Sequence, residues 1–282
     1  MRVLEETDPS QMRDCVLVPT MGALHGGHAS LMKEAVDRAR ADGVPSVVSI
    51  FVNPKQFNDP EDFERYPDRL DEDLAICEEA GVGVVFHPPV DVVYPPGEDV
   101  TGDVLIPPIA TDPGLEDTYR PGHFAGVCQV VSRLFDLCEP SAAVFGKKDW
   151  QQLQCVRTMS AMQNRSLEII PAETVREDSG LAMSSRNFNL SPEAKLQAVA
   201  ISQALFAASN VRIPEQAEAL MQEMLASAGI EPEYAVIRPA DTLMPLPDPG
   251  SPTDEPCRAL IAAKVGGVRL IDNARWTPIA YA

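Results

Sequence analysis

Residues 15–28 read CVLVPTMGALHGGH, and this one stretch passes through three kinds of local pattern. The apolar run at its start predicts a buried strand, and a turn rich in glycine follows it. Over residues 28–41 the apolar positions then recur at helical spacing. A strand that runs through a glycine-rich turn into a helix is typical of open α/β sheets, which bind ligands at the carboxyl ends of their strands.

The same alternation of strand and helix continues along the chain as far as residue 170. Further strands are predicted at 46–52, 82–86, 142–145 and 167–170, and further helices at 67–80, 124–137 and 150–162. Pro67 near the start of the first of these helices and Gly81 after its end fit helix boundaries. Because the strands are continuous apolar runs, we expect an α/β domain with a parallel sheet covered on both faces.

The pattern changes after residue 178. Helices are predicted at 192–208 and 214–228, followed by an extended segment at 234–238, a proline-rich loop and a hairpin at 259–271. In the hairpin two apolar runs flank Gly266 and Gly267, a pair that suits a primed turn. With 282 residues and about 150 per domain, we expect an α/β domain over 1–177 and a smaller α+β lid domain over 178–282.

The chain holds 42 acidic and 23 basic residues, which gives a formal net charge of −19. Non-specific nucleic-acid binding depends on Lys and Arg that displace phosphate counterions, and the sequence contains no Lys/Arg run. We therefore expect neither a nucleic acid nor an anionic membrane surface as a partner. The acidic excess is interpreted as solvated surface and, as a hypothesis, as an adaptation to salt.

Targeting and redox features predict a protein of the reducing cytoplasm. No apolar run approaches the ~20 residues that a membrane-spanning helix needs. The opening sequence MRVLEETDPSQ lacks the basic end and apolar stretch of a signal peptide. The six cysteines include no CxxC pair and no close Cys/His set, so neither a disulfide framework nor a zinc site is expected.

Two of the four histidines, His25 and His28, lie in the glycine-rich turn. Glycines let a backbone approach a phosphate closely, and a helix N-terminus offers N–H groups and the positive end of a dipole. Both rings are then placed to donate to phosphate oxygens. One alternative is a metal-binding pair, although no acidic or cysteine ligand lies nearby in sequence; the other is a structural turn, which needs no histidine. The segment is neither a P-loop nor a GxGxxG motif.

Two further segments carry groups suited to phosphates. Residues 145–152, FGKKDWQQ, lie at a strand end, where a lysine can reach phosphates gathered at the same sheet edge. The alternative is an exposed lysine pair beside an N-capping Asp149. Residues 183–187, MSSRN, place two hydroxyls and a guanidinium in the inter-domain loop, and Arg suits bidentate binding of a polyphosphate. The alternative is an ordinary serine-rich linker.

Two other segments suit a smaller polar ligand. FVNPKQF follows a predicted strand, and its Asn53 and Gln56 are neutral groups that can bind hydroxyls or a carboxylate. Turn formation would explain Asn53 but does not need Gln56. RPGHF precedes a predicted helix, where Arg120 and His123 either position an anion or are ordinary loop and core residues.

Taken together, these segments resemble the pantothenate synthetase (pantoate–β-alanine ligase) family. PTMGALHGGH, IFVNPKQF, RPGHFAGV, VFGKKDWQQL and VREDSGLAMSSRN occur in the family's order and approximate spacing, and RLIDN resembles its C-terminal hairpin. The resemblance implies a Rossmann-like nucleotidyltransferase fold with a HIGH-type motif, and a homodimer. It also implies that ATP and (R)-pantoate give pantoyl adenylate and pyrophosphate, after which β-alanine displaces AMP to give pantothenate.

The resemblance further implies which residues act. His28 is expected to donate a proton, with His25 and Lys148 on the phosphates. Mg²⁺ is expected to bridge phosphate oxygens, approached by Glu72 and Asp73 unless these acids serve only the helix N-terminus. The implied ATP-binding residues are Pro19, Thr20, Met21, Gly22, Ala23, Leu24, His25, Gly26, Gly27, His28, Gly146, Lys147, Lys148, Asp149, Val175, Met183, Ser184, Ser185 and Arg186. The implied pantoate and β-alanine residues are Gln56, Gln152, Asn53 and Arg120.

The sequence departs from the family pattern in places, without removing an implied phosphate or substrate contact. The departures are Lys147, Trp150, Ser179, Asp117 and Asn189. One alternative function is a phosphopantetheine or nicotinate-nucleotide adenylyltransferase, which transfers to a phosphate and is not expected to carry the neutral amide residues. The other is a catalytically silent ATP-binding protein. The presence of His28, Lys148 and Arg186 argues against it, because a protein that had lost activity would have no reason to keep all three.

Overall fold

The computed structural model describes residues 1–57 and 69–276. Within it the chain divides into two compact units. The first unit comprises Met1–Thr111, Glu116–Lys147 and Gln151–Glu173, and the second comprises Asp112–Leu115, Lys148–Trp150 and the chain from Thr174 on. Two short segments that precede Thr174 therefore belong to the second unit, and the adjacent lysines of the FGKKDWQQ segment belong to different units.

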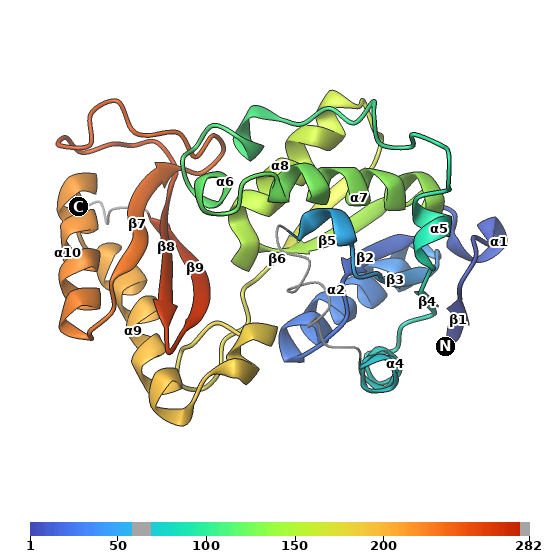
Figure 1. Ribbon diagram of the computed structural model, residues 1–282, viewed down its shortest axis with the longest axis horizontal. Helices are drawn as coiled ribbons and strands as arrows, with labels where there is room; N and C mark the ends of the chain where they lie inside the picture. Colours follow the sequence, from blue (N-terminus) through green and yellow to red (C-terminus); the bar gives the residue numbers. More distant parts are fainter. Residues whose placement is uncertain (58–68, 277–282) are drawn as a thin grey trace. The chain divides into compact units, whose positions relative to one another are not determined.

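The first unit is built on a six-stranded parallel sheet in the order β1-β4-β3-β2-β5-β6 (Figure 1). The strands are β1 (Arg2–Leu4), β2 (Val16–Thr20), β3 (Ser46–Ile50), β4 (Val84–Phe86), β5 (Ala142–Gly146) and β6 (Glu168–Ala172). Every residue of β3 and β4 is buried, as coverage on both faces requires. The predicted parallel α/β class is confirmed. The edge strand β1 was not predicted, because three residues are too short a run to show a period.

Helices lie on both sides of this sheet, with α2 and α4 on one side and α7 and α8 on the other (Figure 1). The helices are α1 (Pro9–Met12), α2 (Gly26–Asp42), α4 (Leu70–Glu79), α5 (Val90–Val93), α6 (Glu116–Tyr119), α7 (His123–Cys138) and α8 (Trp150–Met162). Short 3-10 turns are η1 (Pro54–Gln56), η2 (Pro108–Ala110) and η3 (Lys147–Asp149). The helix predicted at 67–80 is α4, and Pro67 lies outside the described residues.

The second unit packs two helices against a three-stranded antiparallel sheet, which confirms the predicted α+β texture. Its elements are η4 (Ser185–Asn189), α9 (Pro192–Ala208), α10 (Pro214–Ser227), β7 (Pro232–Pro239), β8 (Cys257–Val265) and β9 (Val268–Trp276). Trp276 is fully buried, and its indole N–H donates to the Ala208 carbonyl at 2.9 Å. The β8–β9 turn uses Gly266 and Gly267 at φ +55° and +80°, the left-handed pair that a primed turn requires.

The described residues also bear on the membrane and redox expectations. Over residues 1–57 and 69–276, every helix is too short or too polar to cross a membrane. All six cysteines are buried free thiols.

Candidate active site

The parallel sheet of the first unit has its switch point at β2. From this strand the chain runs through β3 to β4 on one side, and then returns to β5 and β6 on the other. Ligands of open α/β sheets bind at the carboxyl ends of strands at such a point. The end of β2 carries the glycine-rich turn, and the end of β5 carries Gly146 and Lys147. The fold therefore brings these two predicted segments to one edge of the sheet.

The glycine-rich turn is held by a carboxylate from α4. Asp73 accepts the backbone N–H groups of Ala23 at 2.9 Å and Leu24 at 2.7 Å. Gly22 has φ +82°, and a Cβ on it would lie 2.8 Å from Asp73 Oδ2. Ala23 also adopts a left-handed backbone, with φ +50°. A close approach and a strained backbone are thus stabilised by one side chain that is distant in sequence.

Asp73 is 2% exposed, and burial raises the pKa of its carboxyl while the two backbone N–H bonds oppose that rise. Both of its oxygens already accept hydrogen bonds from the turn. Its neighbour Glu72 is exposed and pairs with Arg69 at 3.3 Å. Among the residues that the structure describes, no group of three or more His, Cys, Asp or Glu side chains is arranged to hold a metal ion.

The two histidines lie together at the start of α2, with ring centroids 4.2 Å apart. His25 caps the helix, and its Nδ1 accepts the N–H of Gly27 at 3.1 Å. Since Nδ1 is the acceptor, the neutral His25 ring carries its proton on Nε2, which is therefore a donor. Both rings are partly exposed. Hydrogen-bond donors are thus grouped at a helix N-terminus, an arrangement that favours an anion.

The amide of Gln56, in η1 after β3, has its orientation set by Asn53. Asn53 is fully buried, and its Oδ1 accepts from the Lys55 N–H at 3.2 Å and the Tyr94 hydroxyl at 2.9 Å. Its Nδ2 then donates to the Gly126 carbonyl at 3.1 Å and to Gln56 Oε1 at 3.2 Å. Because Gln56 Oε1 is an acceptor within the protein, the NH₂ group at Nε2 is its donor, and one of the two N–H bonds contacts the sulfur of Met21 at 2.8 Å.

Helix α7 holds η1 from the other side. The His123 ring is 5% exposed, and its Nδ1 contacts the Gln56 carbonyl at 3.0 Å. At Gly126 a Cβ would lie 2.8 Å from Gln56 Cα, so only glycine allows this approach. His123 is therefore a buried residue that supports the turn. Oδ1 of Asn53, which accepts the Lys55 N–H, and Nδ1 of His123, which contacts the Gln56 carbonyl, together fix the backbone from which the Gln56 side chain extends.

Other predicted residues of the first unit are placed as follows. Gln152 lies half-buried in the first turns of α8, beside the buried Gln151. Gln151 Oε1 accepts the Glu116 N–H at 3.1 Å, and Gln151 Nε2 donates to Asp117 Oδ1 at 3.0 Å. Asp117, which departs from the family pattern, therefore forms a hydrogen bond within the first unit. Arg120 is half-buried at the end of α6.

The second unit carries the remaining predicted phosphate residues. Lys148 lies in η3, and its Nζ is 3.8 Å from Asp149 Oδ1. Ser184 caps η4 by accepting the N–H of Arg186 at 3.3 Å, and Arg186 Nη1 donates to the Arg269 carbonyl at 3.3 Å. A further backbone bond of 2.9 Å joins the Met183 N–H to the Val175 carbonyl, so these two predicted residues lie side by side. By contrast Lys147, in the first unit, forms an ion pair with Glu173.

Comparison with known proteins adds to this geometry. A model of the Pantoate-beta-alanine ligase family matches residues 1–275. The chain belongs to the pantoate–β-alanine ligase family. The resemblance seen in the sequence motifs is thereby confirmed for nearly the whole chain.

Members of the pantoate–β-alanine ligase family agree with the chain in sequence and in fold. The pantothenate synthetase of Nocardioides sp. is 48% identical over 270 residues, which cover 91% of this chain and 77% of the relative. That of Rubrobacter xylanophilus is 44% identical over 267 residues, with 92% and 89% covered. The solved pantothenate synthetase of Thermus thermophilus matches with a TM-score of 0.88 at 37% identity, covering 99% of this chain and 100% of that one.

A second solved structure carries ligands. The pantoate–β-alanine ligase of Francisella tularensis, complexed with beta-gamma ATP and beta-alanine, matches with a TM-score of 0.73 at 33% identity. The match covers 93% of this chain and 90% of that one. These matches confirm the Rossmann-like fold expected from the family resemblance.

Sequence reasoning missed several residues that support the site. Tyr94 lies outside every motif, and no local pattern indicated that its hydroxyl reaches Asn53. The sequence predicts Asp73 as a helix N-terminal acid or a neighbour of the cation, and no local pattern indicates its bonds to the turn. Gly126 lies inside the predicted helix at 124–137, and a glycine inside a helical pattern is a known signal of close packing.

Proposed function

We propose that the chain joins (R)-pantoate to β-alanine in two steps that use ATP. A carboxylate oxygen of pantoate attacks the α-phosphorus of ATP, and the bond to pyrophosphate breaks. The amine of β-alanine then attacks the acyl carbon of pantoyl adenylate, AMP leaves, and one proton is released as pantothenate forms. Neither step requires a covalent bond to the protein, so catalysis rests on charge stabilisation and alignment.

The observation that carries this proposal is the pairing of two binding features at one edge of the parallel sheet. The turn after β2 offers helix N–H groups and the donors of His25 and His28, which suit phosphates. The turn after β3 offers the Gln56 amide fixed as a donor, whose Nε2 lies 2.8 Å from the sulfur of Met21. A phosphate site beside an amide donor suits a reaction between a nucleotide and a small hydroxy acid.

In this proposal His28 is the proton donor, and His25 and Lys148 stabilise charge on the phosphates. Backbone and side-chain groups of the two turns and of η4 complete the ATP site, with Ser184, Ser185 and Arg186 on the triphosphate. Gln56 and Gln152 bind pantoate, supported by Asn53 and Arg120. The second unit acts as the lid, and both units serve the same adenylation.

We include Mg²⁺ in the proposal as a cation bound by the phosphate oxygens. It would neutralise part of the triphosphate charge and align the α-phosphorus. Glu72, an exposed carboxylate in the first turn of α4, is the residue that would approach it. We also propose that the protein acts in the cytoplasm and as a homodimer, as the family resemblance implies.

The test is exchange of labelled pyrophosphate into ATP. Exchange that depends on pantoate and proceeds without β-alanine is expected, because adenylation is then the reversible step. Exchange that depends instead on a phosphorylated acceptor would favour an adenylyltransferase. ATP binding without any exchange would support the catalytically silent alternative and refute the proposal.

The roles of the cationic residues are tested by substitution. His28→Ala and Lys148→Ala are each expected to slow pantoate-dependent exchange by on the order of 10²–10³, the cost of removing one donor to a transition-state oxyanion. Lys33→Ala removes a lysine from an exposed position of α2 and serves as the matched control, with unchanged exchange. Unchanged turnover in either site variant removes that residue from its assigned role.

A further inference from the structure

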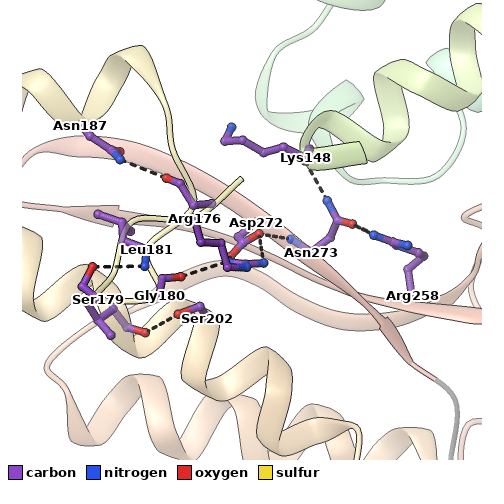
Figure 2. A network of polar contacts seen from close by, with 12 residues as sticks. Lys148, Arg176, Ser179, Gly180, Leu181, Asn187, Ser202, Arg258, Asp272 and Asn273 are labelled. Atoms are coloured by element: carbon purple, nitrogen blue, oxygen red, sulfur yellow. Dashed lines mark hydrogen bonds and ion pairs between the residues drawn. The ribbon is translucent and has the colours of Figure 1, made fainter. Parts of the chain in front are cut away.

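The main chain of Lys148 is anchored by Asn273, a residue of β9 in the same unit. Asn273 Nδ2 donates to the Lys148 carbonyl at 2.7 Å, across a sequence separation of 125 residues. The asparagine is 4% exposed, so this bond is shielded from water. Figure 2 shows the Lys148 side chain running away from the amide that holds its carbonyl. The base of the side chain is therefore fixed, and the ammonium extends from a defined point.

Arg258, on β8, sets the orientation of the Asn273 amide. Its Nε donates to Asn273 Oδ1 at 2.9 Å, and its Nη2 donates to the same oxygen. A guanidinium carries only donors, so the amide oxygen must face Arg258 and the NH₂ group must face Lys148. One orientation of the amide satisfies both neighbours, and the reverse orientation satisfies neither.

The segment that follows Lys148 is held by the same sheet. The guanidinium of Arg258 lies 3.8 Å from the centroid of the Trp150 ring, a cation–π contact. The indole N–H of Trp150 donates to the Ala240 carbonyl at 2.7 Å. Trp150, which departs from the family pattern, thus makes a hydrogen bond to Ala240 that an aromatic ring without an N–H cannot make.

The backbone of Asn273 is fixed as well. Its N–H donates to Asp272 Oδ1 at 2.8 Å. Asp272 is 5% exposed and accepts two bonds from Arg176, at 2.6 and 3.0 Å (Figure 2). Arg176 in turn donates to the Gly180 carbonyl at 3.1 Å. A continuous polar network therefore links the loop before η4 to the carbonyl of Lys148.

We propose that Asn273, oriented by Arg258, is a positioning residue for Lys148 in the adenylation step. The inference rests on the proposed function, in which Lys148 contacts the triphosphate. The ion pair of Lys148 with Asp149 is long, at 3.8 Å, and constrains the ammonium weakly. Its placement therefore depends on the backbone from which the side chain extends. Electrostatic stabilisation of a transition state requires that placement before reaction, and a misplacement of about 1 Å can cost on the order of 10² in rate.

Asn273→Asp tests the bond with the smallest change in shape. The carboxylate still accepts from Arg258 but offers no donor to the Lys148 carbonyl. The expected result is a tenfold or greater loss of kcat in pantoate-dependent pyrophosphate exchange, with the KM for pantoate unchanged. Asn210→Asp makes the same chemical change at an exposed position after α9 and is the matched control, with kcat unchanged.

A double-mutant cycle separates positioning from a merely structural role. If Asn273 acts through Lys148, Asn273→Asp has no further effect on kcat in a Lys148→Ala background. An equal loss of kcat in both backgrounds overturns the inference, as does a folded Asn273→Asp variant with kcat within twofold of wild type. If Asn273→Asp does not yield folded protein, Arg258→Lys is measured in the same cycle, because it removes the planar donor pair that orients the amide.

The result for the unmodified chain keeps the two proposals distinguishable. Pantoate-dependent exchange that Lys148→Ala slows and Asn273→Asp does not slow refutes the positioning role alone. An unmodified chain without pantoate-dependent exchange refutes the proposed function, and this inference with it.

Discussion

Replacement of Asp73 by Asn tests whether the glycine-rich turn owes its conformation to a carboxylate of α4. The aspartate accepts two backbone N–H groups, from Ala23 at 2.9 Å and Leu24 at 2.7 Å. An asparagine of the same shape has one acceptor oxygen, so one of these N–H groups then faces an NH₂ group. The buried turn loses one hydrogen bond to a charged group and gains an unsatisfied donor.

The expected magnitude follows from that count. A hydrogen bond to a charged group contributes about 2 kcal/mol. The left-handed backbone of Ala23, at φ +50°, costs roughly 1 kcal/mol, so the turn shifts toward other conformations once the bond is lost. A shift of about 2 kcal/mol away from the phosphate-binding conformation corresponds to about a 30-fold loss of kcat/KM for ATP.

The assay is pantoate-dependent pyrophosphate exchange at varied ATP, with pantoate saturating. Asp71→Asn, an exposed residue of the same helical turn, is the control and is expected to leave kcat/KM for ATP unchanged. Gly22→Ala should reproduce the loss, because its Cβ would lie 2.8 Å from Asp73 Oδ2. The Mg²⁺ concentration for half-maximal rate should not change in Asp73→Asn, since both carboxylate oxygens serve the turn.

Two outcomes would refute the reasoning. If folded Asp73→Asn matches Asp71→Asn in kcat/KM for ATP, the carboxylate does not hold the phosphate-binding conformation. If instead the variant raises the Mg²⁺ requirement strongly while ATP binding without metal is unaffected, Asp73 acts on the cation.

Three further predictions concern the surrounding fold. Tyr94→Phe removes the hydroxyl bond to Asn53, worth about 1 kcal/mol, and should raise the KM for pantoate about fivefold. The KM for ATP is the internal control, and an unchanged KM for pantoate would show that Tyr94 does not support Gln56. Asp272→Asn leaves the Arg176 guanidinium without its anion and should destabilise the second unit by about 3 kcal/mol, measured by urea unfolding. A urea midpoint equal to that of wild type would contradict a stabilising role of the intact pair. Burial raises the pKa of the Cys15, Cys77 and Cys128 thiols to about 12. The folded state therefore keeps protons that the unfolded state loses above pH ~8.5, and the free energy of unfolding should decrease as pH rises. Thiolate absorbance at 240 nm should stay flat to pH ~10 in folded protein and rise near pH ~8.5 after denaturation.

The sequence by itself determined the architecture and predicted the segments in which the chemistry is proposed to occur. Continuous apolar runs and helical spacing are local patterns, and each follows from burial of one segment against its neighbours. They were sufficient to predict the parallel sheet, the α+β texture of the second unit and the Gly266-Gly267 turn. Because parallel strands present their carboxyl ends at one edge, the order of motifs along the chain also predicted that the turns after β2 and β5 share that edge.

The supporting contacts depend on tertiary structure alone. Asp73 reaches the glycine-rich turn across 50 residues, Tyr94 reaches Asn53 across 41, and Asn273 reaches Lys148 across 125. A single polar contact between distant segments has no period and leaves no local signature in sequence. It exists only when packing brings two buried groups of matching hydrogen-bonding capacity together, and the cost of leaving either group unsatisfied then fixes the geometry. The sequence therefore predicted the residues that are proposed to carry the chemistry, and the tertiary structure decided which residues hold them in place.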